Sequence, residues 1–401
     1  MTGEPAEPFA LDLQRMRAER MAKLRAQMAE QAVDAVVTLT TGGVLYTTGA
    51  HTPAADTGRT FARRAVAVVL AADPSPHLFT PYPGSAPEEL PADHLHPAFQ
   101  PETDDGARAM AATVVDLLGG AQGRVAVDDY TMPMWATFPV VLSGAELVDA
   151  GPLFTAVRLH KTPDEVECLR RSWRITEAAT RAVEARVRPG VRTSELSGAY
   201  LAELFQRGAT TNFLDPVFQP MPDRVANGPW STNGDIPFNL VTTDHVLSEG
   251  EVIWTDTVSG YEGYASDVGR TWVVGPVSAV RQELHERWEA ITAAVLDEIR
   301  PGVTADVLTR VATEANGGNK PWLDHFFLGH TLGLEGGEMQ HIGSDKGQAY
   351  DEQLVLEPGM TVVIEPVTWA EGHAGWRGEE LVVVTEDGHE RISAYPTEPV
   401  A

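Results

Sequence analysis

The stretch VIWTDTVSGYEGYASDVGRTWVVG, residues 252–275, places two carboxylates inside sequence typical of β-strands. Two runs rich in β-branched and aromatic residues flank a turn of glycine, serine and tyrosine, which predicts a β-hairpin. Asp256 lies within the first apolar run, and Asp267 directly precedes the second. Burying an ionised carboxylate is costly unless a cation compensates it. Basic residues are scarce nearby, so the hairpin needs a cation from elsewhere.

A second pair of carboxylates repeats this situation further along the chain. Glu365 follows the apolar run MTVVI, and Glu379 stands shortly before the run LVVV. Both acids therefore adjoin segments that read as buried strands. Four acids in such positions are costly one by one but become favourable if they share metal ions.

An internal repeat relates the two pairs. The motif RPGV at residues 188–191 recurs at 300–303, an offset of 112 residues, each time between a longer and a shorter predicted helix. This offset carries Asp267 onto Glu379 and places the first aspartate three residues beyond Glu365. Each half of the repeat therefore contributes one pair of carboxylates.

A nitrogen ligand is available in the stretch LGHTLGLEGGEMQHIG, residues 328–343, which contains His330. Carboxylate oxygens combined with one imidazole suit manganese, iron, cobalt or zinc. Two such ions about 3.5–4 Å apart form a site that activates a bridging hydroxide. We therefore predict a site for two divalent transition-metal ions.

Each residue of this set also has a simpler interpretation. A histidine in a glycine-rich loop, such as His330, is more often structural than a metal ligand. Asp267 could form an ion pair with Arg270, and Glu379 could form one with Arg377. Four acids and a histidine in repeat-related positions favour the metal site over these separate explanations.

The first part of the chain alternates between helical and extended patterns. Helices are predicted over 9–32 and 105–119, and strands over 34–40, 44–48, 65–71, 123–128 and 139–143. This alternation is typical of a small α/β domain. The following segment, 149–161, lacks clear periodicity. We place the domain boundary there, which predicts domains over 1–155 and 156–401.

The second domain begins with a strong helix signal. Thr162 and Glu165 form a capping box around Pro163, which predicts a helix running to about Val187. A second helix is expected over 194–207.

The composition restricts the partners. The 401 residues include 30 basic and 57 acidic side chains, giving a formal charge of −27 that repels nucleic acid and anionic lipid surfaces. The start of the chain lacks the apolar core of a signal peptide, and the longest apolar run is far shorter than a membrane span. We therefore expect a cytoplasmic protein. Its single cysteine, Cys168, is expected to be buried in a helix.

These residues together resemble the pita-bread metallopeptidases, the family of prolidase, aminopeptidase P, methionine aminopeptidase and creatinase. The segment YTTG at 46–49 is similar to the N-terminal domain of creatinase and prolidase, and RLHKTPDE at 158–165 is similar to the start of their catalytic domain. The resemblance implies an α+β protein. A small α/β N-terminal domain would precede a pita-bread domain with an internal pseudo-two-fold repeat.

The resemblance also implies five metal ligands, namely Asp256, Asp267, His330, Glu365 and Glu379. In this family Asp256 would bind one ion, and Asp267 and Glu379 would bridge both. His330 and Glu365 would complete the second. The ions would be manganese, iron, cobalt or zinc.

Three further site residues are expected. By resemblance, Glu365 is also the general base for the bridging water, and Arg377 holds the bridging glutamate in place. His341, eleven residues after His330, is the best remaining histidine to line the cleft, although His245, His341 and His373 all lie in polar, turn-rich sequence.

The chain departs from the peptidase pattern at two positions. The peptidases have a histidine 17 residues before the first aspartate, where this chain has Asn239, and another seven residues after the ligand histidine, where it has Gly337. In the family these histidines are thought to bind substrate and move protons. An amide and a glycine cannot replace a group that titrates near neutral pH.

Three functions are therefore weighed. The first is a two-metal hydrolase resembling Xaa-Pro dipeptidase or aminopeptidase P, in which a metal-bridged hydroxide attacks an amide carbonyl. The second is a metal-dependent lyase or small-molecule hydrolase, as in relatives that cleave dimethylsulfoniopropionate. The third, a non-catalytic binding domain, is disfavoured because all five ligands are present. The substrate would be a short peptide or small molecule, and relatives suggest a homodimer.

Overall fold

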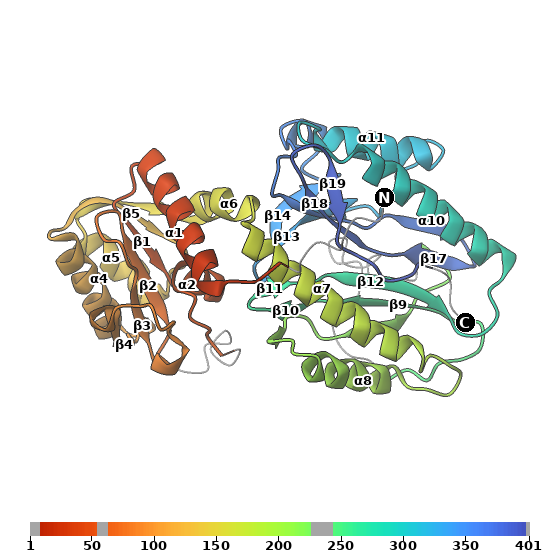
Figure 1. Cartoon of the computed structure of the whole chain (residues 1–401), viewed down its shortest axis with the longest axis horizontal. Helices are drawn as coiled ribbons and strands as arrows, with labels where there is room; N and C mark the ends of the chain where they lie inside the picture. The colour runs from red at the N-terminus through yellow and green to blue at the C-terminus, as the bar shows by residue number, and fades with distance from the viewer. Residues whose placement is uncertain (1–8, 54–62, 226–243, 398–401) are drawn as a thin grey trace. The chain divides into compact units, whose positions relative to one another are not determined.

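The computed structural model describes residues 9–53, 63–225 and 244–397. The chain divides into two compact units, Met1–Arg158 and Leu159–Ala401. The division lies near the end of helix α6 (Gly151–Leu159), so the segment without clear periodicity is helical. Figure 1 colours the chain from red in the first unit to blue at the end of the second.

The first unit is built on a six-stranded mixed sheet. Its strand order is β4-β3-β2-β1-β5-β6. The strands are β1 (Ala35–Thr38), β2 (Val66–Leu70), β3 (His77–Thr80), β4 (Leu95–Pro97), β5 (Gln122–Val127) and β6 (Gly144–Asp149). The helices are α1 (Leu13–Glu30), α2 (Thr41–Thr48), α4 (Asp104–Leu118) and α5 (Met132–Val141), with short 3-10 turns η1 (Pro83–Ser85) and η2 (Ala92–His94).

The helix predictions for this unit are confirmed, but two strand predictions are wrong. The strand expected over 44–48 is helix α2, and the one expected over 139–143 is mostly the end of α5. All of Gly42–Thr48 is buried, so α2 has no polar face to reveal a helical period in the sequence. Thr40 caps its start, and Gly49 ends it with a left-handed φ of 78°.

Within its described residues, the second unit contains four main helices and several small sheets. The helices are α7 (Pro163–Glu184), α8 (Thr193–Gln206), α10 (Ala279–Glu298) and α11 (Ala305–Ala315), followed by the short α12 (Gln348–Asp351). One sheet has the order β12-β9-β8, with β8 (Val217–Pro220), β9 (Val252–Thr257) and β12 (Val268–Val273). A second has the order β14-β13-β15-β18-β19, with β13 (Gly329–Gly333), β14 (Gly336–Ile342), β15 (Thr361–Ile364), β18 (Glu380–Val384) and β19 (His389–Arg391). Smaller pairings join β7 (Thr211–Asn212), β10 (Ser259–Tyr261) and β11 (Tyr264–Ala265), and also β16 (Val367–Ala370) and β17 (Ala374–Arg377).

The start of α7 confirms the predicted capping box. The Thr162 hydroxyl accepts a hydrogen bond from the Glu165 amide at 3.4 Å, and the Glu165 carboxylate accepts one from the Thr162 amide at 2.7 Å. Cys168 is buried in this helix, as expected. The helices over 163–187 and 194–207 are also confirmed as α7 and α8.

The internal repeat is visible in matching backbone bonds. The amide of Gly190 donates to the Leu247 carbonyl at 2.8 Å, and the amide of Gly302 donates to the Leu356 carbonyl at 2.8 Å. Both glycines have left-handed φ values, 89° and 84°, which favour glycine. In each half, the leucine amide then donates back to the valine of the same RPGV motif. The four-residue sequence match therefore marks a genuine structural repeat.

Each helix pair packs on the strands of its own half. The apolar side chains of α7 and α8 meet Phe218, Ile253 and Trp272 of the β12-β9-β8 sheet. Those of α10 and α11 pack against Val362 and Val382 of the five-stranded sheet. Figure 1 shows these helices on the outside of the second unit, with the strands between them. The ends of the central strands are thereby held in a dry interior.

Candidate metal centre

The four carboxylates lie at equivalent places on two strand pairs. Asp256 lies near the end of β9, opposite Gly269 in β12, and Asp267 immediately precedes β12. In the second half, Glu365 directly follows β15 and Glu379 directly precedes β18. Each pair of neighbouring antiparallel strands therefore brings two acids to one end of a hairpin-like unit.

The acids and the histidine come together in one buried cluster. One oxygen each from Asp256, Asp267 and Glu379 can be chosen so that all three lie within 4.8 Å of one another. His330 Nε2 lies 3.2 Å from Asp267 Oδ2 and 3.3 Å from Glu365 Oε1. The structure thus joins residues separated by more than 100 positions in the sequence.

Arg377 faces three of these carboxylates. Its guanidinium lies 3.1 Å from Asp256 Oδ2, 2.6 Å from Glu365 Oε2 and 2.5 Å from Glu379 Oε1. The ion pair of Arg377 with Glu379, the simpler interpretation of this acid, is therefore present, but Arg377 also faces Asp256 and Glu365. One guanidinium cannot neutralise four carboxylates.

Glu379 shows most clearly that a further cation fits here. Its side chain is fully buried, and neither carboxylate oxygen accepts a hydrogen bond of normal geometry within the described residues. Its contact with Arg377 is an ion pair only. Buried carboxylate oxygens without hydrogen bonds are expensive in a dry interior. Oxygen donors with one imidazole nitrogen match the preferences of a divalent transition metal.

The electrostatics of the metal-free cluster favour bound protons. Burial, together with the charge of Glu379, raises the pKa of Asp256 to about 7. Burial and the charge of Asp267 raise the pKa of Glu379 to about 7, and burial raises the pKa of Glu365 to about 8 despite Arg377. For His330, burial favours the neutral form, but the hydrogen bond to Asp267 and the charge of Glu365 raise its pKa to about 10.

These shifts predict how the stability of the metal-free protein depends on pH. All four groups have folded-state pKa values above their ordinary values, so the folded state binds extra protons. Their contribution to the free energy of unfolding is present at low pH and is lost as the pH rises. For the acids the loss occurs between about pH 4 and pH 8, and for the histidine between about pH 6.5 and pH 10. Ligands must be deprotonated to bind a metal, so any metal ion bound by these groups would bind more tightly as pH rises.

The expected result is that the melting temperatures of metal-free and metal-loaded protein diverge as pH increases. Thermal unfolding followed by circular dichroism, with chelator or with added Mn²⁺, measures both curves. Parallel curves would mean that the cluster does not exchange protons for metal.

Arg270 contacts Glu379 and Glu380, which is a different arrangement from the ion pair with Asp267 that the sequence also allowed. Its Nη1 donates to the carbonyl of Glu379 at 2.6 Å, and its Nη2 lies 3.4 Å from Glu380 Oε1. Arg270 therefore holds the backbone beside a predicted ligand rather than neutralising Asp267.

Two supporting residues were not anticipated from the sequence. Gly269 leaves room for Glu379, because a Cβ at this position would come within 2.8 Å of the carboxylate. Thr271 Oγ1 donates to the Arg377 carbonyl at 2.7 Å and accepts from the Arg377 amide at 3.1 Å. Both act across strands, so no local sequence signal marks them.

His341 lies beside the cluster. It is directly opposite His330 in the β13–β14 pair, so both side chains project from the same face of the sheet. Their ring centroids are 6.2 Å apart, and Phe327 contacts both rings. His341 is half-buried, and burial together with the charge of His330 lowers its pKa to about 4. It is therefore less exposed than turn-rich sequence suggests.

The other candidate histidines lie apart from these contacts. His245 pairs with Glu251 at 2.9 Å, and His373 is exposed. Asn239 lies outside the described residues. Gly337 is in β14, paired with Leu332 of β13.

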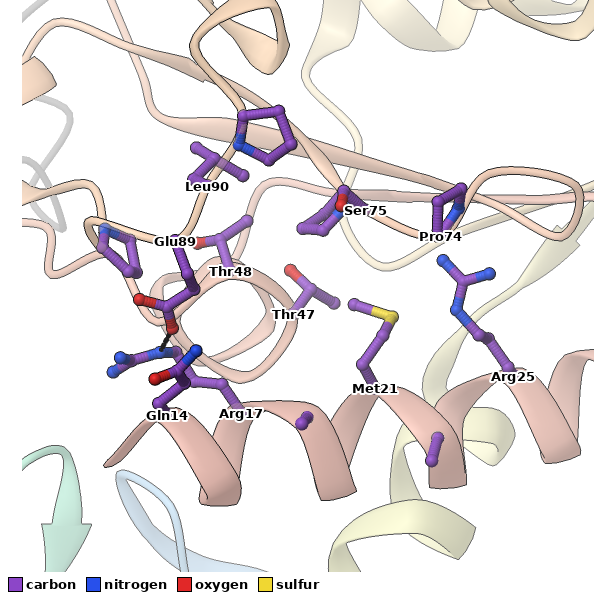
Figure 2. A pocket seen from close by; sticks show the side chains of 15 residues that line it. Gln14, Arg17, Met21, Arg25, Thr47, Thr48, Pro74, Ser75, Glu89 and Leu90 are labelled. Atoms are coloured by element: carbon purple, nitrogen blue, oxygen red, sulfur yellow. Dashed lines mark hydrogen bonds and ion pairs between the residues drawn. The ribbon is translucent and has the colours of Figure 1, made fainter. Parts of the chain in front are cut away.

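The first unit has a separate cavity of about 440 Å³. Figure 2 shows Gln14, Arg17, Met21 and Arg25 of α1 along one side, with Thr47 and Pro74 opposite. An ion pair joins Arg17 to Glu89 at its edge. The groups are too varied to indicate a reaction, and this cavity is not part of the carboxylate cluster.

Comparison with known proteins agrees with the fold and the cluster. The sequence profile of metallopeptidase family M24 matches residues 167–386, more than half of the chain. This chain belongs to metallopeptidase family M24. The profile of the creatinase/prolidase N-terminal domain matches residues 20–160. The expected α+β fold, with a creatinase-type N-terminal part and a pita-bread part, is confirmed, and the M24 chain is a metallohydrolase.

Several relatives of the M24 chain are peptidases by name. An uncharacterized peptidase, YqhT, from Bacillus subtilis is 30% identical over 275 residues, covering 67% of this chain and 71% of the relative. An Xaa-Pro dipeptidase from Pyrococcus furiosus is 28% identical, covering 59% of this chain and 64% of the relative. The crystal structure of dipeptidase PepE from Mycobacterium ulcerans superposes with a TM-score of 0.75 at 22% identity, covering 97% and 98% of the two chains.

Within its described residues, the M24 chain has no helix that combines the length and apolarity needed to cross a bilayer.

Proposed function

We propose that the M24 chain binds two divalent transition-metal ions in the carboxylate cluster and hydrolyses the bond before proline in short Xaa-Pro peptides. The convergence of Asp256, Asp267 and Glu379 oxygens within 4.8 Å carries this proposal. Relatives named Xaa-Pro dipeptidase and Xaa-Pro aminopeptidase support the substrate class.

The five ligands would divide between two ions. Asp256 would hold one ion, Asp267 and Glu379 would contact both, and His330 with Glu365 would complete the second. Manganese, iron, cobalt and zinc all accept this donor set. Such ions, when bound, polarise a substrate carbonyl and lower the pKa of water.

Glu365 is the proposed general base. Burial raises the pKa of Glu365 in the metal-free cluster, so this carboxylate accepts a proton more readily than an exposed one. Its Oε2 is held by Arg377 at 2.6 Å, while Oε1 faces His330 at 3.3 Å. Arg377 therefore acts as a positioning residue. In this arrangement Glu365 can take a proton from attacking water and return it to the departing amine.

His341 is proposed to contact the substrate. Its lowered pKa makes it neutral near pH 7, so the ring can donate one hydrogen bond and accept another. It shares the sheet face of His330 and lies against Phe327. A substrate carbonyl beside the metal centre is a suitable acceptor for this imidazole.

A second candidate function is metal-dependent elimination or hydrolysis of a small non-peptide substrate. Gly337 and Asn239 favour it, because the resemblance to the family's peptidases implies a histidine at each of these two positions. The same metal ligands and the same base would serve either reaction.

A peptide panel separates the two candidates. We expect the metal-loaded chain to release proline from Xaa-Pro dipeptides or the first residue from longer Xaa-Pro peptides, measured by chromatography of the products. The corresponding Xaa-Ala peptides are the control for proline specificity. If the fully loaded chain turns over none of these peptides, while the Asn239→His/Gly337→His double variant does, the peptidase proposal fails and the second candidate is supported.

A further inference from the structure

A second group of side chains that could bind a metal lies in the first unit, outside the carboxylate cluster. Asp73 is in the turn after β2, His77 begins β3, and His94 ends η2. His96 follows in β4, which pairs with β3 in parallel. The proposed hydrolysis uses none of these residues.

The donor atoms are close enough to share one ion. Asp73 Oδ2 lies 3.4 Å from His77 Nε2 and 3.8 Å from His94 Nε2, and all three donors lie within 4.8 Å of one another. Metal–nitrogen and metal–oxygen bonds of about 2.0–2.1 Å in a tetrahedral site place ligand atoms about 3.3 Å apart. The three donors are therefore near coordination spacing, and the stacked imidazoles would have to rotate so that both Nε2 lone pairs point to one ion.

Hydrogen bonds orient both histidines for this purpose. His94 Nδ1 lies 3.3 Å from the Pro76 carbonyl, which can only accept, so Nδ1 carries the proton and Nε2 has a lone pair. His77 Nδ1 is hydrogen-bonded to His96 Nε2 at 3.1 Å. A metal-binding histidine almost always donates its other ring N–H to an outer acceptor, and this hydrogen bond fixes the orientation of the ring.

His77 has a buried nitrogen without a hydrogen bond. The residue is only 7% exposed, and its Nε2 has no hydrogen-bond partner within the described residues, although Asp73 Oδ2 is near. A buried ring nitrogen 3.4 Å from a carboxylate oxygen, without a hydrogen bond of normal geometry to it, is consistent with an ion between the two atoms.

A simpler interpretation is a stack of aromatic rings closing the turn. His77 and His94 do stack, with centroids 4.0 Å apart and planes inclined by 15°, and Phe79 stacks on His96. Stacking accounts for the ring positions but leaves His77 Nε2 unsatisfied. Rotation about the terminal torsion of histidine is soft, so each ring can tilt toward a shared ion at small cost.

We propose that Asp73, His77 and His94 form a binding site for one divalent transition-metal ion, with Zn²⁺ the best match to two imidazoles and one carboxylate. His96 and the Pro76 carbonyl orient the two imidazoles. His94 is partly exposed, so water can occupy the fourth position.

The ion would join the turn between β2 and β3 to the segment that leads into β4, next to the pairing of β3 with β4. Asp73 already accepts a hydrogen bond from the Ser75 amide at 3.0 Å, and Arg25 of α1 donates to its carbonyl. Pro74 and Ser75 form one wall of the cavity in Figure 2. Metal binding at Asp73 would therefore stiffen this wall.

The test measures metal stoichiometry on the full chain. After dialysis against buffered Zn²⁺, elemental analysis should find one equivalent fewer in His94→Gln than in the wild type. Asp73→Asn should lose the same equivalent while keeping the Ser75 hydrogen bond, because the amide oxygen still accepts. Asp93→Asn is the matched control, since it removes a neighbouring exposed charge that is not a donor, and it should retain the wild-type content.

A second arm separates this site from the carboxylate cluster. Co²⁺ titration of the His330→Ala chain should still produce a visible absorption band of a tetrahedral site, and adding His94→Gln should lower this band by the contribution of one ion. His96→Phe, which preserves the ring stack, should weaken binding about 10–100-fold. Hydrolytic activity should be unchanged in His94→Gln. Equal metal content in folded wild type, His94→Gln and Asp73→Asn would overturn the proposal whatever the outcome at the carboxylate cluster.

Discussion

Replacing His330 with alanine is expected to remove about one metal equivalent from the carboxylate cluster and to lower turnover by about 10³-fold or more. The imidazole lies 3.2 Å from Asp267 and 3.3 Å from Glu365, so it occupies the nitrogen position of the proposed site. Losing a metal removes several kcal/mol of transition-state stabilisation, and about 1.4 kcal/mol corresponds to each tenfold change in rate.

Elemental analysis and steady-state kinetics on the same preparation measure both effects. His373→Ala is the control, because it removes an exposed imidazole from the same unit and should leave both quantities unchanged. A His330→Ala chain with full metal occupancy would show that the histidine is not a ligand. The site in the first unit is expected to bind its own ion in both proteins. The metal content of His330→Ala is therefore subtracted from that of the wild type.

Replacing Arg377 with methionine is expected to lower the free energy of unfolding of the metal-free protein by about 3–5 kcal/mol, the usual cost of leaving buried charges without their partner. Arg377 contacts three buried carboxylates, namely Asp256, Glu365 and Glu379. Protonation of these acids relieves the repulsion at low pH. The loss should therefore increase as pH rises above about 7, where the acids ionise.

Metal ions should offset this loss, because they supply positive charge to the same oxygens. Chemical denaturation at pH 6 and pH 8.5, with chelator or saturating Mn²⁺, tests both parts. Arg170→Met is the matched control, since Arg170 forms an exposed ion pair with Glu390 and its loss should cost less than about 1 kcal/mol. Equal destabilisation with and without metal would mean that Arg377 supports the fold but not the charge balance of the site.

Local signals in the sequence were sufficient for several features. The capping box at Thr162 and Glu165 predicted the start of α7 because its two hydrogen bonds involve neighbouring residues. The RPGV repeat predicted the pseudo-symmetry because each glycine must adopt a left-handed φ in the same turn. Strands and helices were confused where burial was complete, as in α2, because no polar face revealed the period.

Contacts between side chains on different strands could not be predicted from local sequence patterns. The space that Gly269 leaves for Glu379 joins residues 110 positions apart, and the hydrogen bonds of Thr271 to Arg377 span 106 positions. The placement of His341 beside His330 depends on the register of β13 and β14, which includes an irregularity after His330. A shift of one residue would turn the side chain to the other face.

The sequence by itself determined which groups need a cation, because an acid next to a buried strand is costly wherever the chain places it. It therefore predicted Asp256, Asp267, Glu365 and Glu379 as one functional set with His330. Only the tertiary structure decided that Arg377 is shared by three of these acids, and that Glu379 remains without a normal hydrogen bond. The same holds for Asp73, His77 and His94, since electrostatic and coordination energies depend on distances of a few ångströms that only folding sets.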